Sequence, residues 1–301
     1  MQHYFILFLK GMAMGIANVI PGVSGGTIAL ITEIYEKLIN SLKSFDLKAL
    51  KLLISLDIKR FIQHTNFYFL LAVLGGSVAS VFSIANLFKF LFTNYPILIW
   101  AFFFGLILAS VYYVGKRVKR WNLPNIIALT IGTAMAISLS FITPATENSN
   151  LFFVFICGIV GISGMLLPGL SGSFILILLG NYELLMVTAV TELNYLLLTV
   201  FLVGSVFGLL SFSHALAWVL KHYKDATLAL LTGFILGSLN IIWPWKKIAE
   251  SMIIDGKEKV LEYHWYFPNI TEKETLIAFT LIVFGIVVVW ALESFSSKKE
   301  A

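Results

Sequence analysis

The stretch Pro-Gly-Val-Ser-Gly-Gly-Thr at residues 21–27 interrupts a long apolar segment near the start of the chain, and Pro-Gly-Leu-Ser-Gly-Ser-Phe at residues 168–174 interrupts a second one. Proline cannot donate a backbone hydrogen bond and glycine has no side chain, so each stretch is expected to break a helix. Lipid tolerates a broken backbone only where protein or a water-filled cavity satisfies the freed N–H and C=O groups. Two such breaks favour two halves that converge on one buried polar site, an arrangement typical of transporters.

The composition indicates an integral membrane protein. Of 301 residues, 59% are hydrophobic and 12% are charged, whereas an average soluble domain has about 25% charged residues. The net charge is +5, and most Lys and Arg residues lie in loops between apolar stretches. Basic residues in such loops indicate membrane topology, so we expect no nucleic-acid partner. The single cysteine, Cys157, excludes an intrachain disulfide and a cysteine-based metal site.

Several apolar stretches are long enough to span a bilayer, whose core needs about 20 helical residues. They are residues 67–92, 97–115, 125–143, 195–220, 227–245 and 276–292. Residues 4–43 and 151–187 carry the two breaks, and we interpret them as re-entrant helical hairpins. The expected fold is therefore an all-α integral membrane protein.

The similarity between the two broken segments indicates a duplicated unit. Residues 21–38 and 168–185 are identical at eight of eighteen positions. Collinear matches continue into the spans, where Gly105-x-Ile-Leu-x-Ser corresponds to Gly233-x-Ile-Leu-x-Ser. We therefore expect an inverted repeat in which each half has one re-entrant hairpin and three transmembrane helices.

The basic residues predict the orientation of these halves, which are residues 1–147 and 148–301. If both hairpins are re-entrant, all four basic clusters fall on one side, which the positive-inside rule makes cytoplasmic. These clusters lie at residues 37–60, 116–120, 221–224 and 298–299. If the hairpins crossed the membrane, the third cluster would face the side opposite the second. We expect a multi-pass protein of the inner (plasma) membrane with both termini in the cytoplasm.

Two connecting segments are expected to lie at the membrane surface. Residues 44–63 mix apolar and basic residues at roughly helical spacing, which predicts an amphipathic helix on the anionic cytoplasmic face. A solvated connector is the alternative. Residues 246–274 form a long outer loop with Trp and Tyr in or beside it, and these rings favour the headgroup level.

The two glycine-rich tips are the candidate binding site. A half-helix that begins near Ser24 or Ser171 would point uncapped N–H groups and the positive end of its dipole toward the membrane centre. Such a site favours an anion, and phosphate is the anion most often held this way. The expected phosphate-binding residues are Ser24, Gly25, Gly26, Thr27, Ser171, Gly172 and Ser173. The alternative is that these residues only allow close helix packing and cap the helices.

The ionisable residues near the spans are candidates for other roles. Glu36 and Glu183 occupy equivalent repeat positions, about 18 Å from the tips at the helical rise, and Glu33 lies deeper. Gating or ion coupling is one interpretation of these carboxylates, and an interfacial location is the other. Lys89 could attract a phosphate headgroup, with snorkelling as the alternative. The histidines show no metal-ligand spacing, and we expect no metal and no cofactor.

The paired glycine-rich stretches, the Tyr-Glu that follows each of them and the duplication over nearly the whole chain resemble the PopT-type polyprenyl-phosphate transporters, formerly a domain of unknown function. The resemblance implies a flippase, not an enzyme, that returns undecaprenyl phosphate from the outer to the cytoplasmic leaflet for cell-envelope synthesis. It implies a polyprenyl phosphate lipid and membrane lipids as partners. Gly26-Thr27 becomes Ser173-Phe174 in the second copy, so the two tips are expected to contribute unequally.

Two other classes of function compete with this interpretation. A secondary transporter or channel for a small inorganic anion could use the same tips without a lipid. A membrane phosphatase could use the serines, but no histidine follows either serine and no arginine lies in a span to hold a transition state. No nucleotide-binding motif is present, and coupling to protons or to sodium stays open.

Overall fold

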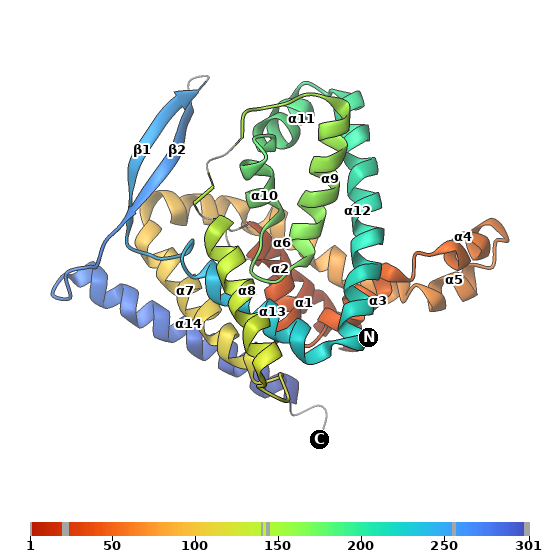
Figure 1. Ribbon diagram of the computed structural model, residues 1–301, viewed down its shortest axis with the longest axis horizontal. Coiled ribbons are helices and arrows are strands. Elements are labelled where there is room, and N and C mark those ends of the chain that lie inside the picture. Colours follow the sequence, from red (N-terminus) through yellow and green to blue (C-terminus); the bar gives the residue numbers. More distant parts are fainter. Residues whose placement is uncertain (1, 20–23, 140, 143–144, 255–256, 298–301) are drawn as a thin grey trace.

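The computed structural model describes residues 2–19, 24–139, 141–142, 145–254 and 257–297 of the chain. Long helices form the body of the molecule, and a two-stranded β-hairpin projects from it (Figure 1). Both ends of the chain lie in the lower part of this view, whereas the β-hairpin and α11 lie at the top.

The described part of the first half of the chain contains four longer helices and four short ones. In order, they are α1 (Gln2–Val19), α2 (Gly25–Ile31), α3 (Tyr35–Lys43), α4 (Leu47–Ile54), α5 (Ile58–His64), α6 (Phe67–Asn94), α7 (Pro96–Gly115) and α8 (Leu123–Leu139). The first tip separates α1 from α2, and residues 21–23 of this tip lie outside the described residues.

The second half has a similar series of longer and shorter helices and adds the β-hairpin. Its elements are α9 (Leu151–Leu166), α10 (Gly172–Leu178), the π-helical turn η1 (Leu184–Thr188), α11 (Ala189–Thr191), α12 (Tyr195–His222), α13 (Lys224–Ser238), β1 (Lys246–Ile254), β2 (Lys257–Trp265) and α14 (Lys273–Ser297). The second tip lies between α9 and α10, which pack against each other (Figure 1).

The helices pair in the same pattern in both halves. Helix α1 packs along α6, and α9 packs along α12. Between the halves, α7 packs along α14, and α13 packs along α8. When α1, α6, α7 and α8 are matched in order with α9, α12, α13 and α14, the pair α1–α6 corresponds to α9–α12, and the pair α7–α14 corresponds to α13–α8. This correspondence is the one expected of a duplicated unit.

Glycines allow the close approach of these helices at matched positions. A Cβ atom added at Gly105 of α7 would overlap the backbone carbonyl of Ile282 in α14. One added at Gly233 of α13 would overlap the carbonyl of Leu129 in α8. Small residues at such positions let helix backbones pack closely where lipid provides no hydrophobic drive for association.

The expected membrane fold is confirmed in its broad form, since the chain is mostly helical and its helices are apolar. Among the described residues, three helices are long and apolar enough to cross a bilayer: Pro96–Gly115, Tyr195–His222 and Lys273–Ala291. Shorter apolar helices cover Phe67–Ser80, Leu123–Leu139 and Leu151–Leu166. Two helices stop before the expected ends of their spans, α8 at Leu139 and α13 at Ser238.

The segment 246–274, expected as an outer loop, departs from the all-α expectation. Strands β1 and β2 pair antiparallel within it, with Lys246 opposite Trp265 and Ile254 opposite Lys257. The sequence carries a signal for this hairpin, because residues 255–256 are Asp-Gly, a dipeptide typical of two-residue hairpin turns.

The segment 44–63, expected as one amphipathic helix, contains two helices. The Asp46 carboxylate accepts hydrogen bonds from the N–H groups of Lys48 and Ala49, both at 2.9 Å, and so begins α4. Asp57 accepts from the N–H of Arg60 at 3.2 Å and begins α5. The second cap explains the division, because an Asp at the N-cap favours a new helix start.

We predict different effects of alanine at the adjacent glycines of α6. A Cβ at Gly76 would overlap the carbonyl of Phe8 in α1, whereas one at Gly75 meets no atom within 4 Å. Gly76→Ala should destabilise the protein, since overpacking typically costs about 1–3 kcal/mol. Gly75→Ala should be neutral or stabilising by up to about 1 kcal/mol, because alanine is the better helix former. Thermal unfolding in detergent measures both, and equal effects would contradict the observed α1–α6 contact.

Candidate functional site

The two tips meet inside the protein although they are far apart in the sequence. The Ser24 hydroxyl donates to the carbonyl oxygen of Leu167 at 3.1 Å. The Thr27 hydroxyl oxygen accepts from the N–H of Gly169 at 3.0 Å. Ser24 and Thr27 are 1% and 0% exposed, so both bonds are shielded from solvent.

Tyr35 adds a third bond between the halves, and sequence reasoning did not select it as a site residue. Its hydroxyl donates to the carbonyl oxygen of Leu166 at 2.9 Å, and its side chain is buried. The last carbonyls of a helix have no partner within the helix, and α9 ends at Leu166. Side chains of the first half therefore donate to backbone carbonyls that have no partner within α9 because the helix ends there. The signal in the sequence was the Tyr-Glu pair that follows both tips.

The break itself depends on Pro168 and Gly169. The residue before a proline disfavours helical geometry, and Leu167 is extended, with φ −80° and ψ 122°. Gly169 has φ +84°, and a Cβ there would lie 2.5 Å from the carbonyl carbon of Phe234 in α13. Glycine is required at this position both for the left-handed backbone and for the contact with α13.

Residues 24–27, the described part of the first tip, have their polar groups bonded within the protein. Ser24 caps α2, and its hydroxyl oxygen accepts from the N–H of Gly26 at 3.1 Å. The Asn18 side-chain oxygen accepts from the N–H of Gly25 at 2.8 Å. The described part of this tip therefore bonds to itself, to α1 and to the second tip.

The second tip has the same backbone but a different bonding pattern. Ser171 has φ −114° and ψ 130°, close to the −113° and 132° of Ser24. Ser171 nevertheless makes no capping bond from its side chain, and its hydroxyl lies 2.8 Å from the hydroxyl of Ser173. Two hydroxyls have two donors, and the bond between them uses one. The pair therefore keeps an O–H donor that a ligand could use.

Cationic side chains cover the far end of α2. The Arg117 guanidinium is 2.9 Å from the Glu33 carboxylate and 3.4 Å from the carbonyl oxygen of Ile31. Lys10 donates to the carbonyl oxygen of Thr32 at 2.6 Å. Cations are favoured there because the C-terminal end of a helix carries partial negative charge. The expected gating residue Glu33 thus lies at this end of α2, away from the tip.

Further polar contacts join neighbouring segments at the same end. Glu36 of α3 pairs with Lys224, the first residue of α13, at 2.6 Å, and both side chains are 51% exposed. The N–H of Arg120 donates to the Asp225 carboxylate at 3.2 Å. Exposed pairs of this kind contribute about 0–1 kcal/mol. Such contacts can break and form without a large change in stability.

Neutral groups stand at the positions of the second half that are equivalent to Glu33 and its neighbour. Gly180 stands at the position of Glu33 and has φ +74°. The next residue, Asn181, accepts from the N–H of Asn148 at 2.9 Å and donates to its carbonyl at 2.8 Å. Glu183 precedes η1, outside the second tip. The side chain of Lys89, expected to attract a headgroup, lies outside the described residues.

Metal binding has no support in the described part of the chain. No group of three or more His, Cys, Asp or Glu side chains there is arranged to hold a metal ion.

Comparison with known proteins shows similarity along nearly the whole chain. A family model described as undecaprenyl phosphate translocase-like matches residues 14–260. A polyprenyl-phosphate transporter of Vibrio cholerae serotype O1 is 38% identical over 304 residues, which cover 99% of this chain and 98% of that protein. A polyprenyl-phosphate transporter of Staphylococcus aureus is 32% identical over 260 residues, which cover 81% of this chain and 87% of that protein. No solved structure matches the chain.

The bond from Tyr35 predicts a difference between two equivalent tyrosines. Tyr35→Phe should lower stability by about 1–3 kcal/mol, because it leaves the buried Leu166 carbonyl without its partner. Tyr182→Phe, the same change at the matched position of the repeat, should have a much smaller effect since Tyr182 is 37% exposed. Thermal unfolding in detergent compares them. Equal destabilisation by both variants would mean that the hydroxyl of Tyr35 does not hold the halves together.

Proposed function

This chain belongs to the undecaprenyl phosphate translocase-like family, and we propose that it transports polyprenyl phosphate by holding the phosphate where the two tips meet. Both relatives are named as transporters and not as enzymes. The observation that carries the proposal is the set of hydrogen bonds from Ser24, Thr27 and Tyr35 to the end of α9 and the second tip. These bonds bring two broken helices to one point in a multi-pass membrane protein.

The phosphate would first meet the second tip. The hydroxyl pair of Ser171 and Ser173 keeps a donor, and the backbone at the start of α10 provides N–H groups and a positive dipole end. The first tip would join when the Ser24 and Thr27 hydroxyls leave Leu167 and Gly169 and donate to phosphate oxygens. The full set of proposed phosphate-binding residues is Ser24, Gly25, Gly26, Thr27, Ser171, Gly172 and Ser173.

We propose that the two tips belong to re-entrant hairpins in an inverted repeat of residues 1–147 and 148–301. The matched helix pairs α1–α6 with α9–α12 and α7–α14 with α13–α8 support this arrangement. The positive-inside rule then puts the end with Arg117 and Lys224 in the cytoplasm, together with both termini, in the inner (plasma) membrane. One hairpin would enter from each side.

Transport would require the two ends to open in turn. The exposed charged contacts at the cytoplasmic end suit a gate, in which Glu33 and Glu36 exchange partners as the halves rock against each other. Glu183 would act at the opposite end, where Lys89 would attract the headgroup. We propose that the flux runs from the outer to the cytoplasmic leaflet, which returns the carrier lipid for cell-envelope synthesis.

The binding proposal predicts that Ser171→Ala with Ser173→Ala weakens the affinity for undecaprenyl phosphate. A hydrogen bond to a charged oxygen contributes about 1.5–3 kcal/mol, so each lost bond should cost roughly tenfold to hundredfold in Kd. The measurement is titration of purified protein with the lipid, followed by leaflet exchange in liposomes.

Ser163→Ala is the matched control, because the Ser163 hydroxyl bonds to the Ile159 carbonyl within α9. It should bind and transport like the unaltered protein. Unchanged affinity in the folded double variant would rule out recognition by these hydroxyls. Inorganic phosphate that competes as well as the lipid would favour a small-anion transporter instead.

The topology predicts where single cysteines react with a reagent that cannot cross the membrane. In a Cys157→Ala background, cysteines at positions 148 and 194 should be labelled in intact cells, because both positions are assigned to the outside. Cysteines at 59, 117 and 224 should react only after the cells are opened. Protection at 194 together with labelling at 224 would contradict the inverted arrangement.

A further inference from the structure

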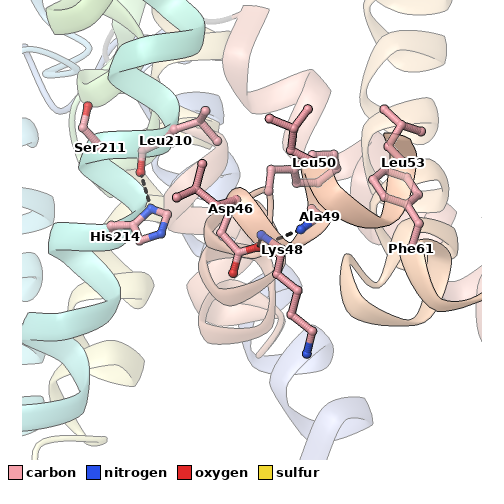
Figure 2. A pocket seen from close by; sticks show the side chains of 11 residues that line it. Asp46, Lys48, Ala49, Leu50, Leu53, Phe61, Leu210, Ser211 and His214 are labelled. Atoms are coloured by element: carbon pink, nitrogen blue, oxygen red, sulfur yellow. Dashed lines mark hydrogen bonds between the residues drawn. The ribbon is translucent and has the colours of Figure 1, made fainter. Parts of the chain in front are cut away.

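A wide apolar groove opens between the short helices α4–α5 and the long helix α12 (Figure 2). Its volume is about 840 Å³. The walls are mainly Phe45, Leu47, Leu50, Leu53, Phe61 and Leu210, and polar atoms come from Asp46, Lys48, Ser211 and His214. Pockets of roughly 300–1,000 Å³ hold drug-sized ligands, so this groove could take a segment of a long apolar chain.

The groove lies near the level of the second tip. Helices α9 and α12 run side by side in a constant register, in which Gly204 approaches Phe155 and Gly208 approaches Ile159. One further turn along both helices brings residues 210–214 of α12 level with the end of α9, where the second tip begins. The groove and the second tip therefore lie at a similar height along α12.

Helix α4, which forms one wall of the groove, also carries exposed apolar side chains, and not all of them line the groove. Leu47 is 77% exposed, Leu50 is 52% exposed and Ile54 is 73% exposed, all on α4. Such side chains are stable at the boundary between headgroups and acyl chains, and the basic residues Lys48 and Lys51 on the same helix suit an anionic headgroup layer. The mouth of the groove would thus face the lipid.

The polar groups around the groove favour an anionic headgroup at its mouth. Figure 2 shows Lys48 extending from α4 and the His214 ring projecting from α12 toward α4. The Nδ1 atom of His214 is 2.8 Å from the Leu210 carbonyl, which leaves Nε2 to face the groove. The one acidic group, Asp46, is engaged by two backbone N–H groups and by His64 at 3.1 Å. The hydrogen bond from Ala49, followed by His64, lowers the pKa of this carboxyl.

We propose that this groove is the lateral opening in which the apolar chain of the polyprenyl phosphate lies while its head passes between the second tip and the cytoplasmic leaflet. The inference rests on the proposed function. The chain would lie along the leucines of α4 and Leu210 of α12, and Lys48 would receive the phosphate as it leaves the tip. Helices α4 and α5 would then form one wall of the transport path in addition to attaching the protein to the surface.

The test compares two charged substitutions on one helix. Leu50→Asp puts a carboxylate into the groove, whereas Ile54→Asp makes the same change on an exposed residue of α4 that does not line it. In liposomes with undecaprenyl phosphate, Leu50→Asp should slow leaflet exchange at least tenfold, and Ile54→Asp should leave it close to normal. An equal loss of leaflet exchange in both variants would mean that α4 only attaches the protein to the surface, and it would overturn the proposal. Normal leaflet exchange in Leu50→Asp would also overturn it.

A photoreactive undecaprenyl phosphate, with the reactive group on its chain, gives an independent result. Its adducts should map to residues 45–61 and 210–214, and adducts confined to other helices would contradict the groove. If Leu50→Asp does not fold, leaflet exchange is measured in Leu210→Trp instead. This substitution fills the groove from α12 without adding charge, so it should also slow leaflet exchange. If the unaltered protein moves no lipid, the proposed function itself is contradicted. Normal transport with adducts only on other helices would contradict the groove as the place of the lipid chain and leave the proposed function intact.

Discussion

The need to satisfy backbone groups at a broken helix inside a membrane protein governs this structure. Helix α9 ends at Leu166, and the carbonyls of Leu166 and Leu167 accept hydrogen bonds from Tyr35 and Ser24 of the other half. An unsatisfied backbone group in hydrocarbon costs several kcal/mol. The halves therefore cannot separate at the tips unless another partner takes over these bonds. A phosphate group could accept from the freed hydroxyls, whereas the freed carbonyls would need a donor such as water.

The two ends of the molecule differ in the strength and the type of their contacts. At one end, Glu33 and Glu36 pair with Arg117 and Lys224, and these exposed pairs are weakened by salt. At the other end, Asn181 forms two neutral hydrogen bonds with Asn148. The helix pairs match between the two parts of the chain, whereas the chemistry of the two ends differs. That difference would let the two ends respond separately to the surroundings on each side of a membrane.

The sequence predicted the features that depend on local chemistry. Repeated Pro-Gly and Ser-Gly pairs indicated both helix breaks and their convergence, and apolar length indicated most of the long helices. The Asp57 cap that divides 44–63 and the Asp-Gly signal of the β-hairpin were present but were given no weight. Partners distant in sequence could not be predicted, because nothing near Tyr35 or Arg117 specifies Leu166 or Glu33. Those contacts follow from how the helices pack.

We propose that the phosphate is held by the backbone and hydroxyl groups of the tips in the interior. Solid-state NMR can test it through dipolar coupling between the phosphorus of bound undecaprenyl phosphate and nitrogen-15 in the amides of Gly172 and Ser173. Binding at the tips predicts coupling of the strength expected for direct hydrogen bonding. Phosphorus coupled only to lysine nitrogens of α4, with none to the tip amides, would contradict it.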